Sequence, residues 1–192
     1  MPKTFVSITM SLDGFIAGAE ISKEQPMGKD GEQLHDWMFT AKTDADVHII
    51  DDLLQSTGAV IVGNGTYSIA IHNDIAWGEV SPYKVPALVL CTEKPKRTVD
   101  GFSYHTDGIY DALQKAKATA GEKDVLVMGG ANTAQQFISA GLADELHIHI
   151  APILLMQGTR LFEQSGHPPI SLKKLSSVDT PAATHLVYEI IK

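Results

Sequence analysis

Short apolar runs alternate with helical patterns over the first two thirds of the chain, and this alternation constrains the fold more than any other feature. Residues 4–10, 59–62, 86–91 and 125–128 have the length and composition of buried strands, and 102–105 is a weaker candidate. Apolar residues recur at helical spacing over 44–55 and 108–120, which Gly58 and Gly121 are predicted to end. Helices between strands form crossover connections, so the pattern predicts parallel pairing.

The last part of the chain has a different pattern. Strand-like segments at 145–151, 170–178 and 184–191 follow one another with only loops between them, which favours antiparallel pairing. A length of 192 residues fits a single domain. We therefore predict one α/β domain over residues 1–192, with a mostly parallel mixed sheet, an antiparallel C-terminal edge and helices on both faces.

Composition excludes several classes of protein. The net charge of −8 disfavours nucleic acid as a partner, because such binding relies on Lys and Arg to neutralise phosphates. No apolar run approaches the roughly 20 residues of a membrane-spanning helix, and the start MPKTFVSITM lacks the pattern of a secretory signal. One cysteine, Cys91, leaves no intramolecular disulfide and fits the reducing cytoplasm.

Two glycines separate the strand 125–128 from a predicted helix in the stretch VLVMGGANTAQQF. Asn132 stands at the position of a helix cap, and Gln135 would complete a capping box. The N-terminus of a helix carries unpaired N–H groups and partial positive charge, so Gly129 and Gly130 predict an anion site there. The alternative is that the glycines only make a tight turn.

Two further strand ends carry residues that suit a phosphate ligand. The strand 59–62 is followed by GNGTY, with a helix expected at 67–71, and the strand 86–91 is followed by TEKPKR. Ligands of open α/β sheets bind outside the carboxyl ends of the strands, so these ends together predict a nucleotide site. Neither glycine motif is a G-x-G-x-x-G or Walker A sequence. Taken alone, Lys94, Lys96 and Arg97 fit a solvated surface loop better than a phosphate clamp, and only the conjunction of the three strand ends favours a nucleotide.

Motifs along nearly the whole chain resemble one known family. ITMSLDGFIAG, VGNGTY, VLCTEK and VMGGANTAQQFISAGLADELHIHIAPILLMQGTRLF occur in this order. Together they resemble the dihydrofolate-reductase-like family, and most closely the reductase (C-terminal) domain of the bifunctional riboflavin-biosynthesis deaminase-reductase. The resemblance implies a dihydrofolate-reductase-like fold and NADPH as cofactor. A deaminase zinc signature is not expected, because the chain has a single cysteine.

The resemblance also implies which residues bind the cofactor. Those that would contact its phosphates follow the second strand: Gly63, Asn64, Gly65 and Thr66. Those that would cradle the pyrophosphate follow the strand 125–128: Gly129, Gly130, Ala131, Asn132 and Thr133. Thr92 and Lys94 would face the adenosine 2′-phosphate. Dihydrofolate reductases usually place a basic residue where Asn64 stands, so the choice between NADPH and NADH depends on Lys94 and its basic neighbours.

Candidates for catalysis come from two segments. SLDGFIAG resembles the family loop that closes over the nicotinamide and the substrate, which makes Asp13 the first candidate. Asp36 in LHDWMF is the second, as a counterpart of the dihydrofolate reductase carboxylate. The alternative for Asp13 is an ordinary Asp-Gly turn. The residues expected to line the substrate pocket are Gly14, Ile16, Ala17, Trp37 and Gly158.

His147 and His149 alternate along a strand, so their side chains are predicted to lie on the same face of the sheet. Such a pair is compatible with a metal site, but no further ligand is evident nearby, and we expect no metal. Cys91 is expected to be a small core residue.

The sequence thus predicts an NADPH-dependent reductase that transfers hydride to a small heterocyclic or imine/carbonyl substrate, with the pterin or ribosylaminopyrimidine class as the first expectation. The alternative is a nucleotide-binding or structural protein that keeps the cofactor cradle without catalysis. A homodimer is implied by the resemblance only.

Overall fold

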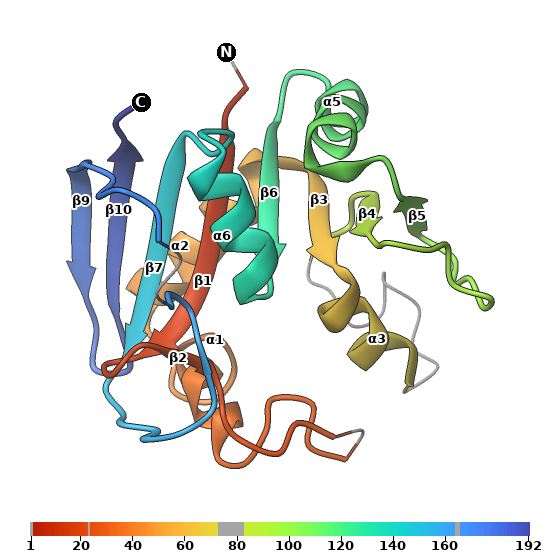
Figure 1. Ribbon diagram of the computed structural model, residues 1–192. Coiled ribbons are helices and arrows are strands. Elements are labelled where there is room, and N and C mark those ends of the chain that lie inside the picture. The colour runs from red at the N-terminus through yellow and green to blue at the C-terminus, as the bar shows by residue number, and fades with distance from the viewer. Residues whose placement is uncertain (1, 23, 73–82, 164–165) are drawn as a thin grey trace.

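A computed structural model describes residues 2–22, 24–72, 83–163 and 166–192. The main sheet has eight strands in the order β5-β4-β3-β6-β1-β7-β10-β9 (Figure 1). Its strands are β1 (Thr4–Ser11), β3 (Thr57–Gly63), β4 (Ala87–Leu90), β5 (Phe102–His105), β6 (Asp124–Gly129), β7 (Glu145–Ala151), β9 (Leu172–Asp179) and β10 (Thr184–Ile190). Pairing is parallel from β5 to β7, and β10 is antiparallel to both β7 and β9. The predicted mixed sheet with an antiparallel C-terminal edge is confirmed.

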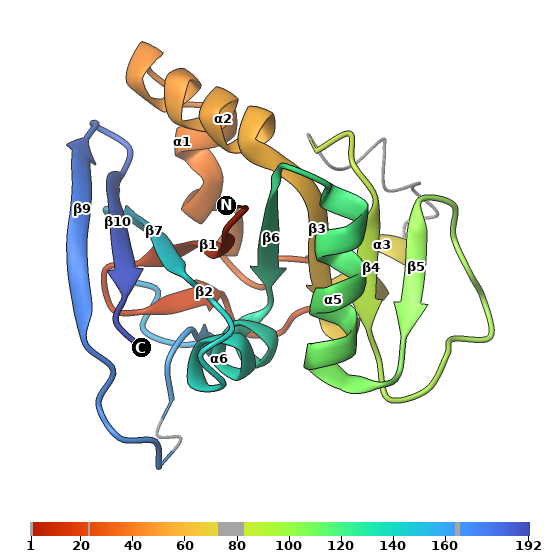
Figure 2. The same cartoon turned by 90° about the horizontal axis from the view of Figure 1, so that it is seen from above.

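Helices cover both faces of this sheet (Figure 2). They are the 3-10 helix η1 (Gly31–His35) and the α-helices α1 (Asp36–Phe39), α2 (Asp44–Ser56), α3 (Asn64–His72), α5 (Gly108–Ala120) and α6 (Ala131–Ser139). α5 and α6 pack on one face, and α1 and α2 lie on the other. A small second sheet pairs β2 (Phe15–Ala17) with β8 (Thr159–Arg160).

Each face of the sheet has its own apolar core. Leu113 of α5 and Phe137 of α6 pack with Val127 in the first core, and Leu53 of α2 packs with Tyr67 of α3 in the second. Central strands are therefore apolar on both sides, as expected for a parallel sheet covered by helices. This double burial explains why 59–62 and 125–128 are continuous apolar runs in the sequence.

Two predicted helix boundaries are wrong. Gly130, in extended conformation, precedes α6, so the helix starts at Ala131 and Asn132 lies inside its first turn. Gln135 completes no capping box, because its side-chain amide donates to the Leu161 carbonyl at 2.7 Å. Gly58 lies in β3, since the chain becomes extended at Thr57 directly after α2.

The predicted end of α5 is confirmed, because Gly121, which has φ 64°, directly follows the last residue of the helix. Across the described ranges, no helix has both the length and the apolar character that crossing a bilayer requires.

Candidate functional site

The carboxyl ends of β3 and β6 lie side by side at one edge of the sheet. Val62 pairs with Gly129, which places Gly63 next to the start of α6. A Cβ added to Gly63 would lie 2.3 Å from Thr133 Oγ1, so only glycine fits there without a shift. Gly129 has φ 106°, a conformation that favours glycine, and the Gly129–Gly130 peptide is cis. The glycines thus permit a close approach of two chain segments.

Two helices begin at this edge, α3 at Asn64 and α6 at Ala131. A Cβ at Gly130 would lie 3.8 Å from Thr66 Oγ1 and 4.0 Å from Ile16 Cδ1. The structure therefore brings the predicted residues of β3, α3 and β6 together with one residue of the predicted substrate loop. Asn64, Gly65 and Asn132 are exposed, so their polar groups are accessible to a ligand. We call this group of strand and helix ends the glycine edge.

The hydroxyl of Thr133, one of the predicted cofactor-binding residues, is buried. Its side chain is 6% exposed, because the hydroxyl packs against Gly63. A contribution of Thr133 to anion binding would have to come from its backbone N–H.

β4 brings the third predicted strand end next to the same edge. Leu90 pairs with Gly63, and Thr92 follows two residues later. Thr92, Lys94 and Lys96 are exposed. The Arg97 carbonyl accepts a hydrogen bond from the Tyr67 hydroxyl at 3.0 Å, which ties this basic loop to α3.

Asp13 binds the loop that follows β7. Its carboxylate accepts hydrogen bonds from Ser11 Oγ at 2.6 Å and from the amides of Leu155 and Met156 at 3.1 and 2.8 Å. The Ser11 hydroxyl, followed by these amides, lowers the pKa of Asp13 and keeps the carboxylate ionised. This geometry braces two loops that are distant in sequence.

The other predicted residues of this loop lie around the small β2–β8 sheet. A Cβ at Gly158, which has φ 132°, would lie 2.0 Å from the Ala17 carbonyl, so the two strands touch here. Arg160 Nη1 donates to the Asp13 carbonyl at 2.9 Å, and its guanidinium lies 4.3 Å from the centre of the Phe15 ring. A Cβ at Gly14 would meet the same guanidinium at 3.7 Å.

Trp37 and Asp36 begin the short helix α1 but lie in different environments. The Trp37 ring is 1% exposed, and its Nε1–H donates to Thr9 Oγ1 at 3.1 Å. Asp36 is half-buried, and its carboxylate accepts from Thr40 Oγ1 at 2.7 Å. The Asp36 carboxylate thus binds Thr40 at the end of α1, whereas the Asp13 carboxylate binds Ser11 and the loop after β7. The described contacts do not bring the two candidate carboxylates together.

A buried polar cluster next to Trp37 was not predicted from the sequence. Trp37 packs on the rings of His149 and His185, with centroids 4.5 and 4.8 Å away. His149 Nδ1 lies 2.8 Å from His185 Nδ1, and His185 Nε2 lies 2.9 Å from Asp46 Oδ1. The only local signal was T-x-x-D at 43–46, since Asp46 completes a capping box with the Thr43 side chain.

Electrostatics in this cluster follow from burial and hydrogen bonding. Burial, followed by the charges of the neighbouring histidines His185 and His147, lowers the pKa of His149 to about 3. Burial alone would raise the pKa of Asp46, but hydrogen bonds from Thr43, His185 and Thr180 outweigh it and lower the pKa. His149 is therefore neutral and Asp46 ionised near neutral pH.

The other histidine of the predicted pair, His147, stacks on Phe5 and lies 3.0 Å from Glu145 Oε2. Within the described part of the chain, no group of three or more His, Cys, Asp or Glu side chains is placed to hold a metal ion. Cys91 is half-buried, and burial raises the pKa of its thiol.

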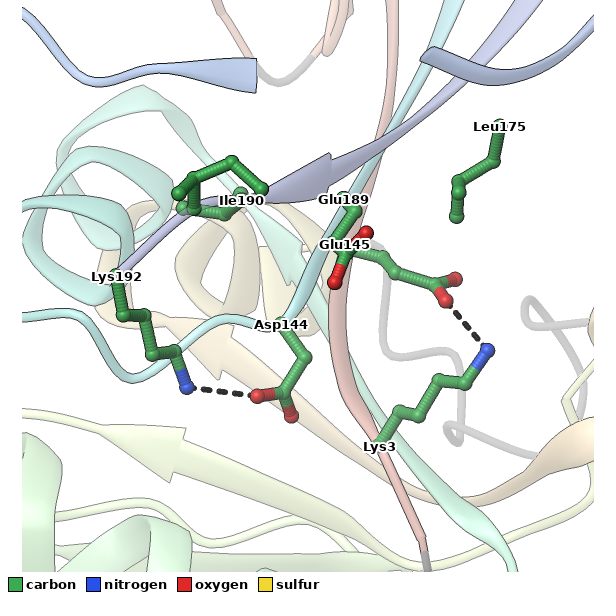
Figure 3. A pocket seen from close by; sticks show the side chains of 8 residues that line it. Lys3, Asp144, Glu145, Leu175, Glu189, Ile190 and Lys192 are labelled. Atoms are coloured by element: carbon green, nitrogen blue, oxygen red, sulfur yellow. Dashed lines mark hydrogen bonds and ion pairs between the residues drawn. The ribbon is translucent and has the colours of Figure 1, made fainter. Parts of the chain in front are cut away.

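A cavity of about 590 Å³ lies at the opposite edge of the sheet from the glycines (Figure 3). All of its charged side chains are paired: Lys3 with Glu145, Lys192 with Asp144 at 2.7 Å, and Glu189 with Lys173, outside the cavity lining, at 3.1 Å. Because these charges neutralise each other and lie at the amino ends of the parallel strands, we do not place the functional site there.

The fold and the glycine edge define a dihydrofolate-reductase-like α/β protein. The structure is similar to dihydrofolate reductase from Enterococcus faecalis complexed with NADP(H) and RAB-propyl, with a TM-score of 0.63 and 13% identity over 99% of this chain and 97% of that chain. It is also similar to a putative riboflavin biosynthesis protein from Shewanella sp. PV-4, with a TM-score of 0.74 and 24% identity over 99% of both chains.

Residues 2–186 match the RibD C-terminal domain, so the chain belongs to the RibD C-terminal domain family. The chain is 28% identical over 190 residues to the riboflavin biosynthesis protein RibD of Corynebacterium ammoniagenes. This alignment covers 95% of the chain but only 51% of that relative. The family resemblance stated from the sequence is confirmed.

Proposed function

We propose that the protein is an NADPH-dependent reductase that transfers hydride to a small heterocyclic or imine/carbonyl substrate of the pterin or ribosylaminopyrimidine class. The observation that carries the proposal is the convergence of glycines, hydroxyls and two helix N-termini at the glycine edge. Family membership and the similarity to a dihydrofolate reductase complexed with NADP(H) support it.

In this proposal the glycine edge holds the cofactor. The amides of Gly63 to Thr66 and of Gly129 to Thr133 would donate to its phosphates, and Thr92 and Lys94 would contact the 2′-phosphate. When bound, the reduced nicotinamide supplies hydride to the substrate carbon. A partial positive charge at each helix N-terminus contributes about 0.3–1 kcal/mol toward an anion, so several such contacts have to act together.

Cofactor preference is tested by titrating NADPH and NADH separately. We expect NADPH to bind more tightly because Lys94 is exposed near the predicted 2′-phosphate position. Lys94→Met should weaken NADPH binding and leave NADH binding unchanged. Lys123→Met is the matched control, since Lys123 is an exposed lysine that precedes β6 at the opposite edge. Tighter binding of NADH by the unmodified protein would contradict the proposal.

Activity is tested by following NADPH oxidation with pterins, aminouracil nucleotides and simple imines or carbonyls. Turnover of a heterocycle and not of the simple carbonyls would identify the proposed class. The alternative, a nucleotide-binding or structural protein that retains the cradle, is favoured if NADPH binds and no compound on the panel is reduced.

We also propose a cytoplasmic homodimer that forms through β9. Every residue of this edge strand is exposed, including the apolar Leu172, Leu175 and Val178. An unpaired strand edge with apolar side chains readily pairs with a second chain. Light scattering should report a dimer, which Leu175→Glu should dissociate, whereas Tyr110→Glu on the exposed side of α5 should not.

A further inference from the structure

A chain of polar side chains runs through the interior on the α2 face and ends at a residue that solvent can reach. Asp46, His185 and His149 are 0%, 3% and 4% exposed, whereas Ser7 is half-buried. Ser7 Oγ lies 3.1 Å from His149 Nε2, which continues the contacts from His149 to His185 and from His185 to Asp46. Four side chains from β1, β7, β10 and α2 thus form one connected path.

We propose that Ser7, His149, His185 and Asp46 form a proton relay that delivers one proton, through the Ser7 hydroxyl, to the substrate of the reductase. This inference rests on the proposed function, because reduction of an imine or carbonyl requires a proton as well as a hydride. It assigns Ser7 as the catalytic proton donor and the other three as positioning residues that reload it.

The hydrogen-bond partners fix the protons when both imidazoles are neutral. The Asp46 carboxylate can only accept, so His185 carries its proton on Nε2 and leaves Nδ1 as an acceptor. His149 then donates from Nδ1, and its Nε2 accepts from the Ser7 hydroxyl. Every hydrogen bond points from Ser7 toward Asp46 in this unloaded state.

An additional proton on His185 reverses the direction of the hydrogen bonds between His185, His149 and Ser7. With His185 doubly protonated beside the Asp46 carboxylate, its Nδ1–H donates to His149 Nδ1. His149 must then carry its proton on Nε2 and donate to Ser7 Oγ. The Ser7 O–H is thereby free to donate to a substrate, which makes this the loaded state.

The transfer balances for one proton. As hydride bonds to the substrate carbon, Ser7 gives its proton to the substrate nitrogen or oxygen and receives the Nε2 proton of His149. His149 takes the Nδ1 proton of His185 on its own Nδ1, and His185 thereby becomes neutral, with its Nε2–H still donating to Asp46. After the product leaves, hydronium at Ser7 gives one proton to Ser7 Oγ and becomes water, Ser7 passes its own proton to His149 Nε2, and His149 returns its Nδ1 proton to His185.

The surroundings suit a relay with one open end. On β1, the neighbours of Ser7 on the same face are Phe5 and Thr9, which are 2% and 7% exposed. Trp37 covers His149 and His185 and excludes water from the middle of the path. Trp37 also binds Thr9, which connects the relay to the predicted wall of the substrate pocket.

The titratable groups that face His149 are His185 from β10, His147 from β7 itself, His35 from η1 and Asp46 from α2. Asp46 is the anion among these, and it contacts His185 directly. The low pKa of His149 agrees with this geometry, since His149 changes its tautomer between the two states but stays neutral in both.

Nuclear magnetic resonance of imidazole nitrogens in the protein without ligands tests the relay independently of turnover. As the pH falls from about 8 to about 5, His149 should switch from the Nδ1–H to the Nε2–H tautomer. Asp46→Asn should abolish the coupled switch. A single His149 tautomer throughout this range would overturn the relay.

Kinetics test the role of Ser7. Ser7→Ala should lower kcat about 100-fold, at the lower end of general acid catalysis, with KM little changed and the fall of kcat on the alkaline side of the pH profile lost. Ser103→Ala is the matched control, because Ser103 Oγ lies 3.0 Å from His105 Nε2 on β5, remote from the relay. Equal effects of both substitutions would overturn the assignment of Ser7.

The two proposals fail in different ways. If no substrate is reduced, the reductase and the donor role of Ser7 both fall, whatever the tautomers do. If substrates are reduced but His149 does not switch, the reductase stands and the relay alone is wrong.

Discussion

Gly63 and Gly65 are two positions apart, yet alanine should lower the free energy of unfolding at Gly63 and raise it at Gly65. A Cβ at Gly63 would lie 2.3 Å from Thr133 Oγ1 and 3.5 Å from the Gly129 carbonyl. A Cβ at Gly65 would meet no atom within 4 Å. Neither glycine has a positive φ, so alanine is allowed by the backbone at both positions and the difference arises from packing alone.

The magnitudes follow from overpacking and from helix propensity. Insertion of a methyl group into a tightly packed contact costs about 1–3 kcal/mol, which corresponds to a fall in Tm of about 2–12 °C for a domain of this size. Thr133 can turn its hydroxyl away, since threonine has two favourable rotamers in a helix, so we expect the lower half of this range. Gly65→Ala in α3 should stabilise by about 0.5–1 kcal/mol.

Urea unfolding of the protein without cofactor measures both variants. Thr133→Ala removes the nearest atom, so the double variant Gly63→Ala/Thr133→Ala should lose less than the sum of the two single changes, by about 0.5 kcal/mol or more. Stabilisation by Gly63→Ala, or strict additivity in the double variant, would show that β3 and α6 do not approach as described.

Three further results are expected. Trp37→Phe removes the buried donor to Thr9 and should cost about 1–3 kcal/mol in urea unfolding, with no loss if that bond is absent in solution. Asp13→Asn leaves one acceptor oxygen in place of two, so hydrogen exchange should quicken at the two amides it binds in the loop after β7 and stay unchanged in β6. The pKa of His149 is about 3 in the fold, below about 6.5 in the unfolded chain, so the unfolded chain binds the proton first as pH falls. Stability should therefore decline by about 1.4 kcal/mol per pH unit between about pH 6 and about pH 4 because of this group, and His149→Gln should remove that slope, whereas an equal slope in both proteins would contradict the assignment.

Much of the fold could be predicted because the patterns that indicate its strands and helices lie within short stretches of the sequence. The runs 59–62 and 125–128 are apolar at every position, since their strands are covered on both faces, and α5 was predicted with its observed bounds. β2 and β8 were not predicted, because strands of three and two residues have no detectable periodicity. The start of α6 was missed because a glycine, and not a polar side chain, precedes it.

The candidate site was predictable to the same extent. The glycines after β3 and β6 are visible as motifs, and parallel pairing brings them together. The partners of Asp46 and Asp13 are not visible, because His185 is 139 residues from Asp46 and Met156 is 143 residues from Asp13. The Asp-Gly pair at 13–14 suggested only a turn from the sequence, whereas in the structure the Asp13 carboxylate also binds the loop after β7. The roles of individual site residues in binding and catalysis stay predictions.

Both chain termini are anchored at the amino ends of the parallel strands. The Lys3 amide donates to Asp124 at 2.7 Å, and Lys192 binds Asp144, so the two ends lie together at the edge opposite the glycines (Figure 1). Peptide tags, fluorescent reporters or surface linkers attached to either terminus would thus point away from the glycine edge. The fold accordingly permits immobilisation or fusion from both ends without obstructing ligand access.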